Sequence, residues 1–242
     1  MIVAQGLAKR FDAVEAVRDV SFEAPDGRIT ALLGPNGAGK TTTLRMISTL
    51  VAPTRGSARV DGHDVGAEPL AVRARIGMLS DARGLYGRLT ARENIAYYGA
   101  LRRMARDAVE ASIMRLADLL DMKPLLDRRT DGFSQGERMK VAIARALVHD
   151  PPNVILDEPS NGLDVMTTRN LREVIRNLRT AGKCVLFSSH VMQEVSALCD
   201  EIVIVAHGAV AARGTAEALL AASGRANLED AFVHLAGEAL AP

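Results

Sequence analysis

The sequence has only two cysteines, Cys184 and Cys199, and it has no long run of apolar residues. Both cysteines stand in apolar segments, "KCVLF" and "SALCD", without the spacing of a metal site, which indicates buried thiols in a reducing compartment. No stretch approaches the roughly 18 apolar residues that cross a bilayer. The N-terminal "MIVAQGLAKRF" lacks the apolar core and the cleavage site of a signal peptide. We therefore expect neither a membrane span nor a leader peptide.

An excess of charge of one sign is also missing. The 30 basic and 29 acidic residues leave a formal net charge of +1. Composition therefore gives no electrostatic case for binding nucleic acid or an anionic membrane surface, and we expect no nucleic-acid partner. A length of 242 residues, 48% of them hydrophobic, suits one large α/β domain or two small ones.

Short apolar runs predict the strands of the core. They cover residues 28–34, 153–158, 183–189 and 201–208, and each is bounded by Gly, Asn, Asp or His. Helical patterns lie between them, which indicates a mostly parallel sheet flanked by helices. Residues 1–27 alternate with period two instead, as antiparallel strands with one solvated face do, and residues 56–65 are expected to join them.

The remaining segments read as helices. Residues 85–149 contain no convincing strand, and Thr90 with Glu93 has the pattern of a helix capping box. The Ala-rich tail after Gly214 predicts two short helices. We expect a single α/β domain with a P-loop NTPase core (1–84 and 150–215) that includes an N-terminal antiparallel β part. A helical insert (85–149) and a short helical tail (216–242) complete it.

One motif predicts a phosphate-binding loop. "ALLGPNGAGKTT" fits G-x-x-x-x-G-K-[ST] and lies between a predicted strand and a predicted helix. Glycines let backbone N–H groups converge on phosphate oxygens, Lys40 would bridge the β- and γ-phosphates, and Thr41 would ligate Mg²⁺. The alternative is a Gly-rich turn without a ligand. The expected ATP contacts are Gly34, Pro35, Asn36, Gly37, Ala38, Gly39, Lys40, Thr41 and Thr42.

Two further strands end in polar residues that suit the same chemistry. "NVILDE" ends in Asp157, which would hold Mg²⁺ through water, and Glu158, which would orient and activate the attacking water. His190 follows "CVLFSS" at the same predicted edge. Its imidazole would either hydrogen-bond a γ-phosphate or cap the helix that follows.

A second phosphate-binding pattern appears about a hundred residues after the first. In "FSQGERMKVAIARAL", Ser134 can cap a helix, Gly136 allows a ligand close to the backbone, and an apolar stripe follows. Helix N-termini attract anions through free N–H groups and the helix dipole. Ser134 and Glu137 also form an S-x-x-E capping box, which any soluble helix can use.

The order of these motifs resembles the nucleotide-binding subunit of an ATP-binding cassette (ABC) transporter. A Walker A motif at 34–41, a signature-like "FSQGE" at 133–137, a Walker B motif at 154–158, "SNGLD" at 160–164 and then His190 follow one another over roughly residues 1–215. In this family two subunits meet head to tail, and the signature of one covers the γ-phosphate held by the other. The resemblance therefore implies a homodimer that hydrolyses two Mg-ATP molecules in composite sites.

The resemblance also assigns contacts outside the first loop. It implies that Phe11 stacks on adenine, although Phe11 also reads as an ordinary strand aromatic. Ser134 and Gly136 would contact the γ-phosphate across the dimer, and Asp164 would meet the opposite subunit. Where the family usually has a glutamine near Mg²⁺, this chain has Asp81, which would ligate the metal or point toward the permease.

Three residues of the signature depart from the usual Leu-Ser-Gly-Gly-Gln, namely Phe133, Gln135 and Glu137. The roles of Gln135 and Glu137 stay open. Glu137 would place a carboxylate near polyphosphate unless its capping bond turns it back onto its own helix.

The resemblance implies a membrane permease made of separate chains. Its cytoplasmic helices would dock between core and helical insert, so the subunit would sit peripherally on the cytoplasmic face of the membrane. The finer resemblance is to ABC-2 exporters, in particular to sodium-efflux subunits of the NatA type. The alternatives are an exporter of drugs, lipids or polysaccharides, and a soluble ABC ATPase that acts on ribosomes or DNA. The transported substrate is set by the permease.

Overall fold

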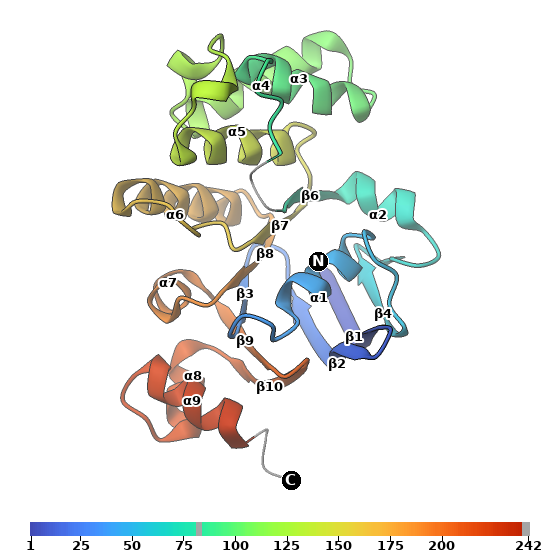
Figure 1. The fold of residues 1–242 in the computed structure, drawn as a ribbon, viewed down its shortest axis with the longest axis vertical. Coiled ribbons are helices and arrows are strands. Elements are labelled where there is room, and N and C mark those ends of the chain that lie inside the picture. The colour runs from blue at the N-terminus through green and yellow to red at the C-terminus, as the bar shows by residue number, and fades with distance from the viewer. Residues whose placement is uncertain (81–83, 239–242) are drawn as a thin grey trace.

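The computed structural model describes residues 1–80 and 84–238, and Figure 1 shows a curled sheet with helices on both faces. Within this part of the chain the sheet has ten strands, in the order β5-β4-β1-β2-β10-β9-β3-β8-β7-β6. Neighbours from β9 to β6 run parallel to one another. These strands are β3 (Ile29–Leu33), β6 (Ile76–Leu79), β7 (Asn153–Asp157), β8 (Cys184–Ser189) and β9 (Glu201–Ala206). The four predicted core strands are confirmed.

The antiparallel half of the sheet starts at the N-terminus. It consists of β1 (Ile2–Phe11), β2 (Val14–Ala24), β4 (Arg55–Val60) and β5 (His63–Asp64). The alternation of buried and exposed residues along β2 matches the prediction that one face of these strands is solvated. β10 (Ala209–Gly214) joins the two halves, antiparallel to β9 and parallel to β2. The sequence prediction omits β10, because its Ala-rich sequence has little of the β-branched content that marks strands.

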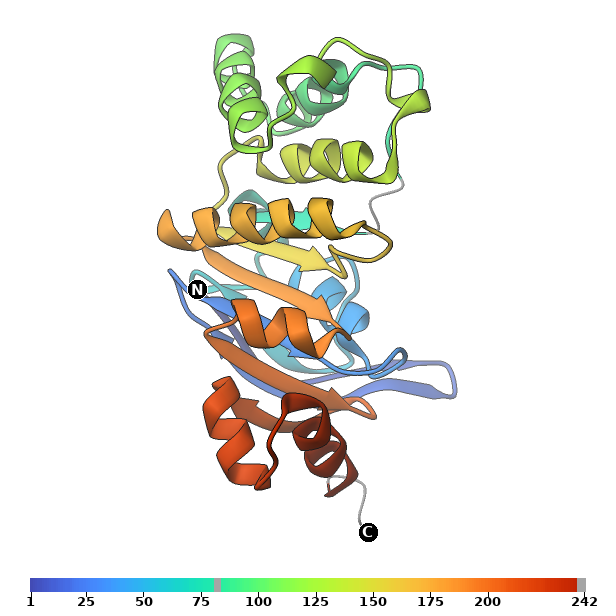
Figure 2. The ribbon, with the colours of Figure 1, turned by 90° about the vertical axis from the view of Figure 1, so that its left-hand side faces the viewer.

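Helices cover both faces of the sheet. α1 (Lys40–Ile47) packs its buried Leu44 and Ile47 against both halves of the sheet, in a core shared with α2 (Pro69–Arg75). α6 (Val165–Thr180) and α7 (Met192–Leu198) cover the other face, as Figure 2 shows. α8 (Ala216–Ser223) and α9 (Leu228–Glu238) pack on β9, β10 and α7. The two predicted tail helices are confirmed.

The helices between β6 and β7 gather at one end of the molecule (Figure 1). They are α3 (Ala91–Leu101), α4 (Arg106–Leu119) and α5 (Gln135–Leu147), with short 3₁₀ turns at Lys123–Leu125 and Thr130–Gly132. Thr90 and Glu93 form the predicted capping box at the start of α3. Buried residues of these helices, among them Ile95 and Ile113, continue into the core of the sheet's α6 face. Throughout the described chain, every helix is too short or too polar to span a membrane.

Both cysteines are free thiols, as predicted. Cys184 is buried, and burial raises the pKa of its thiol to about 12. Cys199 is partly buried, and burial likewise raises its pKa above the ordinary value. Both thiols are therefore protonated near neutral pH and are poor nucleophiles.

Candidate nucleotide site

The order of the parallel strands creates the site. β3, β8 and β7 are neighbours, so the segments that follow their carboxyl ends meet at one edge of the sheet. These segments carry the phosphate-loop motif, His190 and the Asp157–Glu158 pair. The sheet thereby brings together three motifs that lie far apart in the sequence.

The loop after β3 forms a backbone cradle. Gly39 caps α1 with φ +102°, and a Cβ there would lie 2.7 Å from the Ala16 carbonyl oxygen, so only glycine fits. A cavity of about 250 Å³ is lined by residues 35–42 together with Ala16 and Glu158. The structure therefore places the predicted loop residues and Glu158 around one hollow. Gly34 lies just before the hollow and takes part through its carbonyl group.

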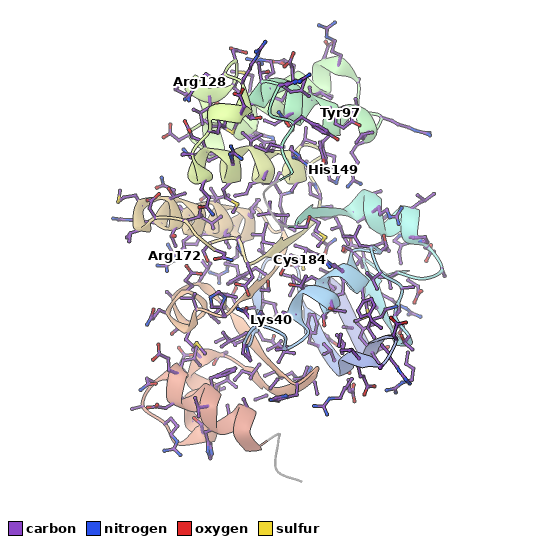
Figure 3. All side chains as sticks on the ribbon, in the orientation of Figure 1. Lys40, Tyr97, Arg128, His149, Arg172 and Cys184 are labelled. Carbon is purple, nitrogen blue, oxygen red and sulfur yellow. The ribbon has the colours of Figure 1, made fainter. Side chains whose placement is uncertain are left out.

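Lys40 is held inside the cradle. Its side chain is 5% exposed, and its Nζ donates to the carbonyl oxygens of Gly34 at 2.7 Å and Pro35 at 3.1 Å. The same nitrogen lies 3.1 Å from Glu158 Oε1. Lys40, labelled in Figure 3, is the first residue of α1. Lys40 thus joins the phosphate loop to the end of β7.

Asp157 lies against hydroxyl groups. Its Oδ1 accepts hydrogen bonds from Thr41 Oγ1 at 3.1 Å and Ser188 Oγ at 2.6 Å. Ser188 Oγ in turn accepts from the Glu158 backbone N–H at 2.9 Å. Among the described residues, no three His, Cys, Asp or Glu side chains gather as a metal cage. The Thr41 hydroxyl and the Asp157 carboxylate are still suitable ligands for Mg²⁺, because this ion binds through one or two carboxylates and otherwise through water and phosphate.

Glu158 has a strained backbone and two engaged carboxylate oxygens. Its φ is +45°, in the left-handed region that non-glycine residues rarely adopt and that often marks functional sites. Oε1 faces Lys40, and Oε2 lies 2.9 Å from His190 Nδ1. The alternative that His190 caps the following helix is wrong, because Val191 is the N-cap of α7 and no side chain caps it.

The second phosphate-binding pattern lies away from this cradle. α5 begins beyond α6 in Figure 1, whereas α1 lies on the other side of the sheet. The capping box is confirmed: Ser134 Oγ accepts from the Glu137 N–H at 3.2 Å, and the Glu137 carboxylate accepts from the Ser134 N–H at 2.8 Å. Arg128 also donates to Glu137 at 2.9 Å. Hydrogen bonds from Ser134, then Arg128, hold the pKa of Glu137 below its ordinary value.

Comparison with known proteins decides the family. The family model described as "ABC transporter" matches residues 17–161. The ATP-binding protein NatA of Bacillus subtilis is 45% identical over 90% of this chain and 91% of its own. The daunorubicin/doxorubicin resistance ATP-binding protein DrrA of Streptomyces peucetius is 36% identical over 95% of this chain and 71% of its own.

The chain belongs to the ABC transporter family. Solved structures agree with its fold. The ATP-binding subunit of an ABC transporter superposes with a TM-score of 0.88 at 29% identity, covering 97% of this chain and 99% of that chain. A dimeric bacterial ABC cassette superposes at 0.81 and 24% identity, covering 89% and 98%. The cassette described here is thus an ATP-binding and ATP-hydrolysing α/β protein.

Asp164 and Phe11, two residues with predicted contacts, do not line the hollow. Asp164 caps α6, accepting from the Thr167 N–H at 3.0 Å and from Thr167 Oγ1 at 2.6 Å. These bonds lower the pKa of Asp164. Phe11 is 45% exposed next to the Lys9 ammonium and is not among the residues that line the hollow. Asp81 lies outside the described residues.

The sequence prediction missed one residue of the cassette's site. Ser188 joins Asp157 to the backbone of Glu158, whereas the sequence analysis assigns a role only to His190 in "CVLFSSH". The available signal was the pair of polar residues that ends an otherwise apolar, fully buried strand. Polar side chains buried at a strand's carboxyl end need partners, and in a parallel sheet those partners lie at the neighbouring strand end.

Proposed function

We propose that this cassette hydrolyses Mg-ATP with Glu158 as the residue that positions and activates the attacking water. The contact of Glu158 with both Lys40 and His190 is the observation that carries this proposal. With both oxygens oriented, the carboxylate needs little rearrangement to accept a proton from water, and such positioning is the main means of catalysing phosphoryl transfer.

Other residues around the hollow bind and orient the nucleotide. Backbone N–H groups of residues 36–42 cradle the phosphates, and the Lys40 ammonium, held inside the cradle, pairs with the β- and γ-phosphates. His190 holds Glu158 and hydrogen-bonds the γ-phosphate. Thr41 and Asp157 would hold Mg²⁺, which neutralises charge on the phosphate oxygens when bound. Phe11 stacks on adenine.

A homodimer completes the site. In one chain, α5 and α1 lie on different sides of the sheet, so Ser134 and Gly136 serve a cradle in a second copy placed head to tail (Figures 1 and 2). A cassette of the same fold has been solved as a dimer, which supports a dimer here. The loop ending at Asp164 then meets the opposite subunit through its backbone, while the Asp164 side chain keeps its own helix capped.

A separate membrane permease is the driven partner. A cavity of about 340 Å³ lies between the end of β6 and helices α3 and α5, with Tyr98, Arg102 and Arg145 in its wall. We infer that cytoplasmic helices of the permease dock there, which holds the cassette on the cytoplasmic face of the membrane. The residues 85–149 would act as the helical subdomain that receives them.

Export is the direction that the relatives favour. NatA, the doxorubicin resistance protein and a Nod factor export protein are each at least 35% identical to this chain. Sodium efflux is the finer proposal, because NatA has the higher identity. Drugs, lipids or polysaccharides are the second candidate cargo. Efflux assays on vesicles that contain the cassette and its co-purifying permease distinguish them: ATP-dependent loss of trapped ²²Na⁺ supports sodium, and its absence contradicts it.

Glu158→Gln tests the chemistry. The amide keeps the shape but cannot accept the proton, so we expect ATP binding to persist and hydrolysis to fall on the order of a hundredfold or more. This variant is expected to elute as an ATP-dependent dimer on size exclusion. Lys40→Ala is expected to lose ATP binding itself. Turnover near that of the wild type in Glu158→Gln would refute the assignment.

A further inference from the structure

Glu194, in α7, is a buried carboxylate outside the site described above. The residue is 9% exposed, and both of its oxygens are engaged. Oε2 accepts a hydrogen bond from Ser160 Oγ at 2.6 Å, and Oε1 lies 3.7 Å from an Arg172 guanidinium nitrogen. Burying a carboxylate is costly unless it is paired, and here Ser160 and Arg172 compensate the charge.

Ser160 and Glu194 belong to the two segments that carry the proposed catalytic pair. Ser160 stands two residues after Glu158, and Glu194 stands four residues after His190. The segments are therefore joined twice, through Glu158 and His190 at 2.9 Å and through Ser160 and Glu194 at 2.6 Å. The second bond is the more buried of the two.

Arg172 extends the link to α6 (Figure 3). Its Nε is buried and has no hydrogen-bond partner among the described residues. The negative charge of Glu194 therefore compensates the positive charge of the Arg172 guanidinium. α6 begins at the end of the loop 160–164, where Asp164 caps it. Glu194 therefore contacts both sides of this loop. It binds Ser160 at the start of the loop, and it pairs with Arg172 of α6, the helix that begins where the loop ends.

We propose that Glu194 is a positioning residue for ATP hydrolysis. Its hydrogen bond to Ser160 fixes the distance between Glu158 and His190. It also links that distance to the position of the loop 160–164. The proposal rests on the proposed roles of Glu158 and His190. Displacement of a catalytic group by about 1 Å can slow a reaction on the order of a hundredfold, so loss of this bond should affect turnover rather than ATP binding.

The test compares Ser160→Ala, Glu194→Ala, the double variant and Glu194→Gln as full-length chains, with Mg-ATP as substrate. We expect kcat to fall roughly 10- to 100-fold in both single alanine variants, with ATP affinity unchanged within about twofold. The double variant should be no slower than Glu194→Ala, because both changes break one bond. Glu194→Gln, whose amide oxygen still accepts from Ser160, should recover part of the rate. Glu173→Gln, an exposed carboxylate of α6, is the matched control and should behave as the wild type.

The outcomes separate this inference from the proposed function. Wild-type kcat in Ser160→Ala, or fully additive losses in the double variant, would overturn the role of Glu194. If Glu194→Ala does not fold, Ser160→Ala still decides the question, because it removes only a hydroxyl group. If Glu158→Gln is inactive and Ser160→Ala is fully active, the proposed function is supported and only the role of Glu194 is refuted. Active Glu158→Gln removes the proposed function.

Discussion

At the scale of single residues, two of the three departures of this chain from the usual signature have structural explanations. Glu137 is turned back onto its own helix by the Ser134 N–H and by Arg128, so its charge is already compensated. Gln135 reaches the loop after the Walker B motif, where its Nε2 donates to the Asn161 carbonyl oxygen at 3.3 Å. Gly162 makes room for it, because a Cβ there would lie 2.4 Å from Gln135 Nε2. The two positions are therefore sterically coupled.

This coupling predicts the outcome of a double-mutant cycle. Gly162 has φ +73°, so Gly162→Ala should cost about 1–2 kcal/mol from the backbone plus the displacement of Gln135. Adding Gln135→Ala should relieve the displacement and give a coupling energy of roughly 0.5–1 kcal/mol in denaturant unfolding. Gly182→Ala is the control, because φ is +79° and no atom lies within 4 Å of its added Cβ. Equal costs at Gly162 and Gly182, with strict additivity, would contradict the coupling.

At the scale of elements, the junction between α5 and β7 contains a half-buried histidine, His149, whose neutral form the native state favours. His149 Nε2 lies 3.1 Å from the Ile76 carbonyl oxygen at the start of β6. Burial, and then the nearby charge of Arg102, lowers the pKa of His149 from 6.5 to about 4. The native state therefore favours the neutral imidazole, and protonation of His149 destabilises the fold.

The sign of the pH effect follows directly. The unfolded chain takes up a proton near pH 6.5 and the native state only near pH 4, so stability should fall as the pH drops between these values. Because the ring is partly solvated, we expect a loss on the order of 1–2 kcal/mol. His149→Gln can keep the bond to Ile76 and should flatten this part of the curve of unfolding free energy against pH. His207→Asn, at an exposed turn with φ +48°, should leave it unchanged.

At the scale of the whole molecule, the separation of the two phosphate-binding patterns predicts how lesions combine. A mixed dimer can pair one Lys40→Ala subunit with one Ser134→Arg subunit. In the head-to-tail arrangement both changes fall on the same composite site, and the other site stays intact and should bind ATP. A dimer with both changes in one chain has a lesion in each site. Nucleotide stoichiometry, measured by equilibrium binding, should therefore differ between the two dimers, and identical stoichiometry and affinity would refute the arrangement.

Features that depend on residues close together in the chain could be predicted from the sequence. The phosphate loop, the capping boxes at Thr90 and Ser134, and the buried strands follow from spacings of a few residues, because backbone geometry relates such residues directly. The sequence also identified Asp157, Glu158 and His190 as strand-end residues at one expected edge.

The tertiary structure decided which distant residues touch. The strand order puts β8 between β3 and β7, and this places Ser188 on Asp157 and His190 on Glu158. Likewise, the packing of α5, α6 and α7 decided the partners of Gln135 and Glu194. Sequence spacing cannot give these contacts, because side-chain partners across a sheet or between helices depend on how elements pack, and the same local patterns are compatible with many packings.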